Sequence, residues 1–182
     1  MRHRLVVSML LFCGVGFPQS ADLERGRYEV RGFGGLAVET SNILGDSKFS
    51  GGVGAAMGLN RYVALTGHYA LDRIGRSNWC FFGPCAPLAN EKMYEFMGGL
   101  RLSFPNHSRV TPYAAGTIGA VRLVNFRSSA SSPSTQFAVG AGLGLSIRIR
   151  PRFGVALDLH AIHAVSTEIW VIRPTAGFYY RF

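Results

Sequence analysis

Apolar and polar residues alternate along most of the chain after its first twenty residues. In residues 137–149 (FAVGAGLGLSIRI) the odd positions are Phe, Val, Ala, Leu, Leu, Ile and Ile, and the even positions are Ala, Gly, Ser or Arg. Successive side chains of a strand point to opposite faces, so this period of two predicts a strand with one apolar face. The same alternation predicts strands at 61–72, 93–104 and 170–182.

Four further segments alternate less strictly but fit the same pattern: 29–39, 51–60, 111–123 and 153–164. Most of the resulting eight segments have about 10 to 13 residues, longer than the roughly five or six of soluble sheets and close to the length of tilted membrane strands. After the first twenty residues no run of about 18 apolar residues occurs, which excludes membrane-spanning helices. An even number of strands lets a barrel close with both ends on one side.

The connections between the predicted strands alternate between short and long. The short ones are 60–61, 105–109 and 150–152, and the longer ones are 40–48, 73–92, 125–136 and 165–169. Outer-membrane barrels have this asymmetry, with short turns in the periplasm and longer loops outside. We therefore predict an all-β protein of the bacterial outer membrane, an eight-stranded antiparallel transmembrane β-barrel with up-and-down meander order.

The first residues have the pattern of a secretory signal peptide. A basic start is followed by an apolar stretch at 5–17, which is too short to span a bilayer as a helix, and then by small or polar residues. We expect residues 1–20 to be removed near Ser20 or Ala21, leaving a barrel domain at 21–182.

The whole chain has 19 Lys and Arg against 10 Asp and Glu, a net charge of +9. Loss of Arg2 and Arg4 with the signal peptide lowers the basic count to 17, so the exported chain stays basic. Cytosolic basic proteins of this size often bind nucleic acid, but an exported one meets other polyanions, such as phosphorylated lipid headgroups. We expect outer-membrane lipids and lipopolysaccharide as its surroundings and no nucleic-acid partner.

If the apolar face lies against lipid, the lumen receives the charged side chains of the strands. The residues expected in a lumen ionic network are Glu29, Arg31, Glu95, Arg101, Arg122, Arg148, Asp158, His160, Arg173 and Arg181. Folding the hairpins predicts His160 opposite Arg173, and Glu95 opposite Ala120 and diagonal to Arg122. Closure of the barrel would bring Arg181 near Glu29. Buried charges persist only when paired, so we expect this network to fill and rigidify the barrel. The alternative is a narrow porin, which the excess of Arg would make anion-favouring.

Two cysteines remain after removal of the signal peptide. Cys80 and Cys85 flank Gly83-Pro84 in the largest predicted loop. Because exported proteins meet an oxidising compartment, a disulfide between them is the leading interpretation, and a zinc pair is the alternative.

The chain resembles the opacity-protein and OmpA-like family of small outer-membrane barrels in residues 110–120 (VTPYAAGTIGA), 137–163 and 177–182 (GFYYRF). The resemblance implies a surface protein of structural, adhesive or defensive type without a cofactor. We expect a monomer whose outer loops would bind any surface ligand. It also implies that the C-terminus, with the lipid-facing Phe178, Tyr180 and Phe182, is recognised by the barrel-assembly machinery.

One enzymatic alternative is a lipid-A-modifying barrel of deacylase type, since such enzymes share this fold and use a His and a Ser near the outer rim. His163, Ser166 and Glu168 are the candidate residues. The deacylase motif places Ser two residues after His, but Val165 occupies that position here, and a nucleophilic Ser needs an adjacent base. The histidines do not cluster, so no metal site is expected.

Overall fold

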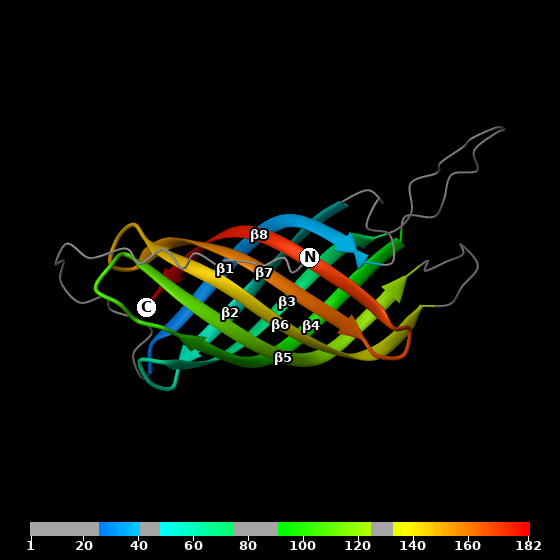
Figure 1. Ribbon diagram of the computed structural model, residues 1–182, viewed down its shortest axis with the longest axis horizontal. Coiled ribbons are helices and arrows are strands. Elements are labelled where there is room, and N and C mark those ends of the chain that lie inside the picture. The colour runs from blue at the N-terminus through cyan, green and yellow to red at the C-terminus, as the bar shows by residue number, and fades with distance from the viewer. Residues whose placement is uncertain (1–25, 41–47, 75–90, 125–132) are drawn as a thin grey trace, which may run out of the picture.

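The computed structural model of the protein describes residues 26–40, 48–74, 91–124 and 133–182. These residues form eight strands: β1 (Tyr28–Glu39), β2 (Lys48–Gly58), β3 (Val63–Ile74), β4 (Glu91–Ser103), β5 (Val110–Val124), β6 (Ser134–Arg148), β7 (Phe153–Ala164) and β8 (Ile169–Arg181). Each strand pairs antiparallel with the next, and β8 pairs with β1 to close a barrel of tilted strands (Figure 1). The predicted fold and strand order are confirmed. Within these ranges, no helix is long and apolar enough to cross a membrane.

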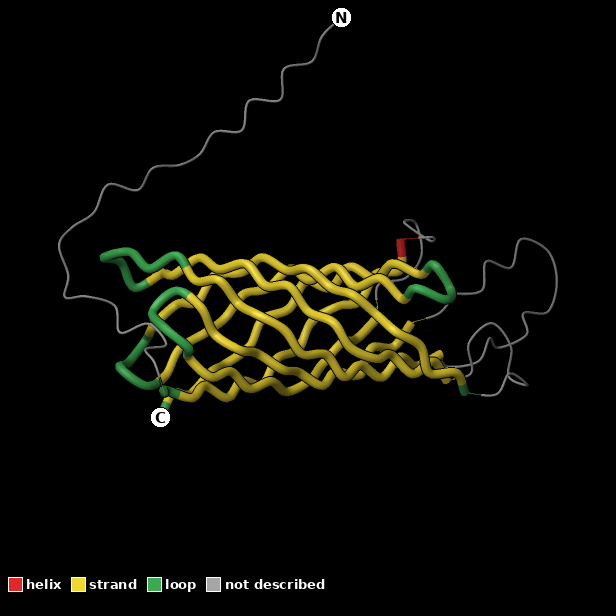
Figure 2. Tube along the Cα trace, turned by 90° about the horizontal axis from the view of Figure 1, so that it is seen from below, coloured by secondary structure: helices red, strands yellow, loops and turns green. Residues whose placement is uncertain are grey.

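The connections lie at two different ends of the barrel. Residues 59–62, 104–109 and 149–152 form turns at the end where the C-terminus lies (Figure 2), which we call the short-turn end. The opposite end, which we call the long-connection end, holds the turn at 165–168 and the strand ends that border residues 41–47, 75–90 and 125–132. In the first short turn the Asn60 side-chain oxygen accepts hydrogen bonds from the backbone N–H groups of Tyr62 and Val63, both at 2.8 Å. Such Asx contacts stabilise a turn locally, which explains why β2 ends at Gly58 rather than at the predicted residue 60.

The outer face of the barrel is a continuous apolar surface. The exposed fractions of Phe96, Leu143 and Phe178 are 73%, 66% and 62%. Positions between such residues point inward and are small, polar or charged along much of each strand. This is the arrangement of a membrane barrel, in which lipid replaces the packed layer that would cover such a surface in a soluble protein.

The strand register brings together charged residues far apart in the sequence. Closure of the barrel places Glu29 of β1 opposite Arg181 of β8, and the β7–β8 hairpin places His160 opposite Arg173, as the hairpin pattern predicts. The β4–β5 register differs from the predicted one by one residue, because Glu95 lies opposite Val121. The inward positions of these strands build the site described next.

Candidate functional site

The lumen near the short-turn end holds an ion-pair cluster around one buried carboxylate, which we call the Glu29 cluster. Arg101 Nη1 lies 2.7 Å from Glu29 Oε1, and Arg181 Nε lies 2.9 Å from Glu29 Oε2. Arg31 Nη2 is 3.5 Å from the same carboxylate, and Arg181 also donates to Ser146 Oγ at 3.3 Å. Glu29 is 2% exposed. Three guanidinium groups therefore compensate its burial.

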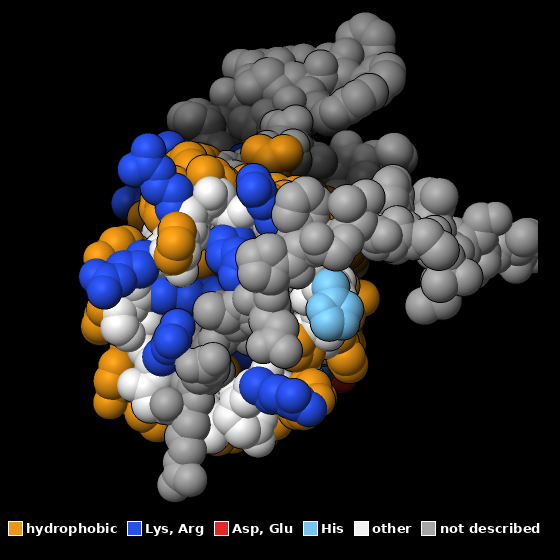
Figure 3. Space-filling view, turned by 90° about the vertical axis from the view of Figure 1, so that its left-hand side faces the viewer, with side chains coloured by type: hydrophobic (Ala, Val, Ile, Leu, Met, Phe, Trp, Pro, Cys, Tyr) orange, Lys and Arg blue, Asp and Glu red, His pale blue; other side chains and the backbone are white. Residues whose placement is uncertain are grey.

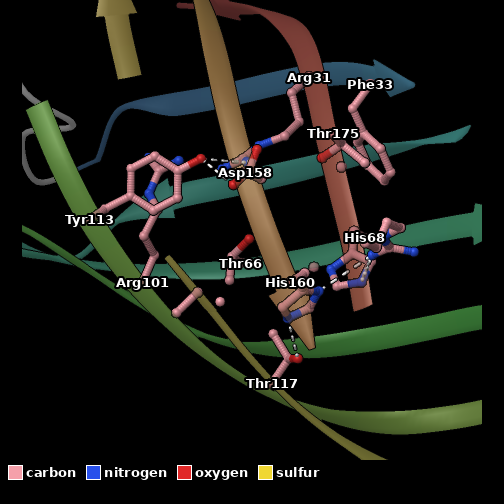
Figure 4. Close-up of a pocket in the computed structure, with 15 residues that line it drawn as sticks. Arg31, Phe33, Thr66, His68, Arg101, Tyr113, Thr117, Asp158, His160 and Thr175 are labelled. Carbon is pink, nitrogen blue, oxygen red and sulfur yellow. Dashed lines mark hydrogen bonds and ion pairs between the residues drawn. The ribbon is translucent and has the colours of Figure 1, made fainter. Parts of the chain in front are cut away.

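Arg31 connects this cluster to a second carboxylate deeper in the barrel. Its Nη1 atom lies 3.3 Å from Asp158 Oδ2, and the Tyr113 hydroxyl donates a hydrogen bond to Asp158 Oδ1. Figure 4 shows Tyr113, Arg31 and Asp158 converging on one point from three different strands. The Arg101 guanidinium also lies over the Tyr113 ring, 5.3 Å from its centroid. These contacts cross the lumen and join non-adjacent strands.

A second ionic cluster, the Arg173 cluster, lies further from the short-turn end. Arg173 Nη1 contacts Glu95 Oε2 at 2.7 Å and Asp72 Oδ2 at 3.2 Å. Its Nη2 atom lies 3.4 Å from His68 Nε2 and 3.3 Å from His160 Nδ1. One guanidinium therefore holds two carboxylates that are both fully buried.

Other polar groups of the Arg173 cluster are also partnered, although Glu95 Oε1 has no hydrogen-bond partner within the described residues. Ser50 donates a hydrogen bond to Asp72, and His68 Nε2 lies 3.4 Å from Glu95 Oε2. The His160 ring contacts Thr117 Oγ1 at 3.4 Å (Figure 4).

The two clusters have opposite formal charges when both histidines are neutral. The Glu29 cluster with Asp158 has three arginines and two carboxylates, and the Arg173 cluster has one arginine and two carboxylates. Together they hold four positive and four negative charges. The excess of Arg in the whole sequence is therefore not an excess within this network.

A polar cavity of about 60 Å³ lies between the two clusters. Arg31, Arg101 and Tyr113 line one side of it, and His68 and His160 line another (Figure 4). A water molecule needs roughly 10–15 Å³ on this measure and two or more polar partners. The cavity therefore has room for a few water molecules.

The aromatic side chains of the lumen lie over glycines of the neighbouring strand. Tyr113 pairs with Gly144, and the ring occupies the space that a Cβ atom at Gly144 would need. Tyr179 and Gly154 make the same kind of pair at the β7–β8 seam. The glycine spacing in 137–149 thus has a packing reason, since the glycine leaves room for a ring inside a narrow barrel.

Toward the long-connection end most of the buried inward side chains are apolar, a feature that our sequence reasoning missed, although the buried Gln136 also lies there and bonds to Thr167. The buried residues of this apolar layer are Ala37, Met93, Met97, Val121, Leu123, Ala138, Ile162, Ala164, Ile169 and Val171. The signal was present in the sequence, because β5, β7 and β8 have apolar residues at their inward positions near this end. The residues expected in the lumen are the charged ones of the strands, so apolar residues at inward positions did not point to a layer of their own.

Two residues expected in the ionic network lie elsewhere. Arg122 is exposed on the outer side, because Val121 and Leu123 occupy the inward positions of β5 at that point. An arginine near a strand end can extend its charged group toward the membrane surface. Arg148 points inward at the last residue of β6 but is half-buried at the short-turn end, outside the two clusters.

The residues considered for deacylase chemistry do not converge. The His163 ring stacks on Trp170, with centroids 4.5 Å apart, and its buried Nδ1 has no hydrogen-bond partner within the described chain. Ser166 and Glu168 are exposed in the turn between β7 and β8. In the described residues there is also no group of three or more His, Cys, Asp or Glu placed to hold a metal.

The C-terminal aromatic residues lie on the lipid-facing side of the closing strand. Phe178, Tyr180 and Phe182 are all exposed to the surroundings of the barrel. The Phe182 ring lies 6.2 Å from the Tyr28 ring of β1, and the backbones of these residues exchange two hydrogen bonds of 3.1 Å. The expected signal peptide and the pair Cys80 and Cys85 lie outside the described residues.

Comparison with known proteins identifies the family of the chain. A family model described as outer membrane protein beta-barrel domain matches residues 6–182. No curated protein sequence matches the chain.

Several solved outer-membrane barrels have the same fold. Neisserial surface protein A has a TM-score of 0.64 at 18% identity, over 86% of this chain and 96% of that one. The N-terminal barrel domain of Pseudomonas aeruginosa OprF has a TM-score of 0.62 at 13% identity, over 87% and 98%. The attachment invasion locus protein Ail of Yersinia pestis has a TM-score of 0.55 at 17% identity, over 87% and 99%.

Proposed function

The chain belongs to the family of outer membrane protein β-barrel domains, and on that premise we propose that it is a non-enzymatic surface protein of structural or adhesive type with a side-chain-plugged lumen. Its location is the bacterial outer membrane, as for its structural neighbours. The finer role is inferred from what fills the barrel.

The observation that carries the proposal is the succession of layers along the lumen. An ion entering from the short-turn end meets the paired charges of the Glu29 cluster, then the small cavity, and then the Arg173 cluster. Beyond these lies the apolar layer, whose side chains have no nitrogen or oxygen atom to replace a hydration shell, and the buried Gln136 in this half is already bonded to Thr167. Eight strands enclose an interior just wide enough to be filled by side chains. Passage would require the breaking of buried ion pairs and the wetting of the apolar layer.

The charge balance of the network weakens the alternative of an anion-favouring porin. Four guanidinium groups face four carboxylates, and each of them has an opposite charge within 3.5 Å. No surplus positive charge of the two clusters remains to attract an anion. The surroundings of His163 likewise give no support to the deacylase alternative, because its ring stacks on Trp170 and lacks a contact with Ser166.

Single-channel recording of the refolded protein, run beside a lipid A deacylation assay, tests the proposal. We expect no conductance steps and no released acyl chains. A matched variant supplies the positive control: Leu123→Ser with Ile162→Ser in the apolar layer, together with Arg173→Ser in the ionic cluster, should produce measurable conductance. Steady conductance by the unmodified barrel would overturn the plugged-lumen proposal, and acyl release would overturn the non-enzymatic one.

A further inference from the structure

Arginines gather at the short-turn end of the barrel (Figure 3). Each of the three short turns contributes at least one exposed arginine: Arg61 between β2 and β3, Arg109 between β4 and β5, and Arg150 and Arg152 between β6 and β7. We call these four residues the arginine rim. They are separate from the buried arginines of the lumen clusters.

The arginine rim has no acidic side chains of its own. The sequences of the three turns are LNRY at 59–62, FPNHSR at 104–109 and IRPR at 149–152. Among the described residues, none of the four rim arginines forms an ion pair. The nearby Glu29 is buried and already held by three arginines.

The rim charges lie directly beside the apolar outer surface. Arg61 precedes Tyr62, whose ring lies under its guanidinium with 4.5 Å to the centroid. Arg150 follows Ile149 and Arg152 precedes Phe153, and both apolar side chains are exposed on the outer face. Aromatic residues at a membrane boundary lie at the level of the lipid headgroups. The neighbouring guanidinium groups are therefore placed at the same level.

We propose that the arginine rim binds the phosphate-bearing headgroups of anionic phospholipids in the leaflet at the short-turn end. A guanidinium donates two parallel hydrogen bonds to phosphate oxygens, and it also packs on aromatic faces, as Arg61 does on Tyr62. A basic residue near an anionic membrane surface strengthens its binding about fivefold. Among the described residues the long-connection end differs, because the exposed arginines Arg73 and Arg122 share that end with the exposed Glu168.

Lipid enrichment around the intact barrel tests this proposal. The mature protein is reconstituted with phosphatidylcholine and a minor fraction of phosphatidylglycerol, and the co-purifying lipid is quantified by mass spectrometry. We expect phosphatidylglycerol to be enriched, and the variant Arg150→Gln/Arg152→Gln to lower its apparent affinity about 25-fold at low ionic strength, which is fivefold for each charge. The matched control Arg73→Gln/Arg122→Gln removes the same charge at the other end and should change the affinity less than about twofold.

Three outcomes would overturn the proposal. Equal losses in both double variants would show a general charge effect rather than a rim site. Unchanged enrichment in Arg150→Gln/Arg152→Gln would show that the rim does not bind these lipids. Displacement of the lipid by about 10 mM inorganic phosphate at constant ionic strength would show a site for free phosphate instead. Heat-modifiable gel mobility of each variant checks that the barrel is folded, and variants with altered mobility are replaced by the single changes.

Discussion

The two halves of the lumen are filled by different chemistry. Toward the short-turn end, the Glu29 and Arg173 clusters place eight charged side chains inside the barrel, each with a partner of opposite charge. Toward the long-connection end, the apolar layer packs side chains such as Met93, Leu123 and Ile162 that are at most 1% exposed. Both halves exclude solvent, but only the first depends on exact pairing.

This difference predicts how each half responds to substitution. Removal of one member of a buried ion pair leaves an uncompensated charge, which lowers the free energy of unfolding. Replacement of both members by uncharged groups can leave the free energy of unfolding nearly unchanged. Removal of part of an apolar side chain costs transfer free energy and leaves a cavity, whatever happens to its neighbours. The ionic half should therefore show strong coupling between mutations and the apolar half should not.

The largest effect is expected for Arg173→Met. Asp72 and Glu95 are both fully buried and both depend on this guanidinium. We expect the free energy of unfolding to fall by about 3–5 kcal/mol, as for other broken buried ion pairs. Urea titration of the refolded protein, followed by gel mobility, measures the change.

The matched control for Arg173→Met neutralises its partners as well. The triple variant Arg173→Met/Asp72→Asn/Glu95→Gln removes all three charges and should recover most of the lost stability. A triple variant that is no more stable than Arg173→Met would contradict the view that charge pairing, rather than packing alone, governs this half.

Leu123→Ala in the apolar layer should have the next largest effect. Leu123 is 1% exposed, so truncation leaves a cavity and should cost about 2–4 kcal/mol. Leu143→Ala is the matched control, because Leu143 is 66% exposed on the outer face, where lipid fills the space. Equal losses of unfolding free energy in the two variants would mean that the apolar layer does not pack as a core.

Most of the fold could be predicted from the sequence, because period-two alternation is a local signal. The Glu29–Arg181 and His160–Arg173 pairs also followed, since each joins adjacent strands whose register the alternation fixes. The contact between Arg101 and Glu29 did not follow, because it crosses the lumen between strands that are not neighbours. Such contacts depend on the tilt and stagger of the closed barrel, which no single hairpin determines.

The apolar layer was missed for a related reason. Near the long-connection end, Val121 and Leu123 are inward and apolar, and Arg122 between them points outward. A rule that places apolar residues toward lipid and charged residues in the lumen gives the opposite orientation for these three residues. The outer neighbours of Arg122 on the same face, such as Ile118, are apolar and exposed. The apolar residues along the whole of β5 therefore predict which of its faces contacts lipid better than the single charged residue near its end does.

Gly144→Ala should have a smaller effect, at the boundary of the ionic half. A Cβ atom at this position collides with the ring of Tyr113, which is 4% exposed and donates to Asp158. Overpacking of this kind costs about 1–3 kcal/mol. Gly116→Ala is the control, because a Cβ atom there meets nothing within 4 Å. If Gly116→Ala lowers the free energy of unfolding as much as Gly144→Ala does, a collision with the Tyr113 ring is not the cause of the destabilisation.

The smallest effect on the folded barrel is expected for removal of Phe182. Its side chain is 59% exposed and contacts the rings of Tyr28 and Tyr180 on the outer face, whereas the neighbouring Arg181 points into the lumen and joins the Glu29 cluster. Deletion of this residue should lower the free energy of unfolding by less than about 1 kcal/mol, because exposed contacts contribute little. Urea titration of the refolded deletion variant measures this.

The amount of protein in the outer membrane should respond differently to the same deletion. Phe182 directly follows β8, the strand that closes the barrel against β1, and its backbone exchanges two hydrogen bonds with Tyr28. A barrel cannot leave a strand edge open in lipid, so this seam must form before the protein is stable in the membrane. If the chain end is also recognised during assembly, deletion should lower the outer-membrane level in cells while the surviving fraction keeps its normal gel mobility.

The variant Phe182→Tyr retains an aromatic ring and the backbone contacts, so its level should stay near that of the unmodified protein. Unchanged levels after the deletion would assign recognition and closure to the rest of β8.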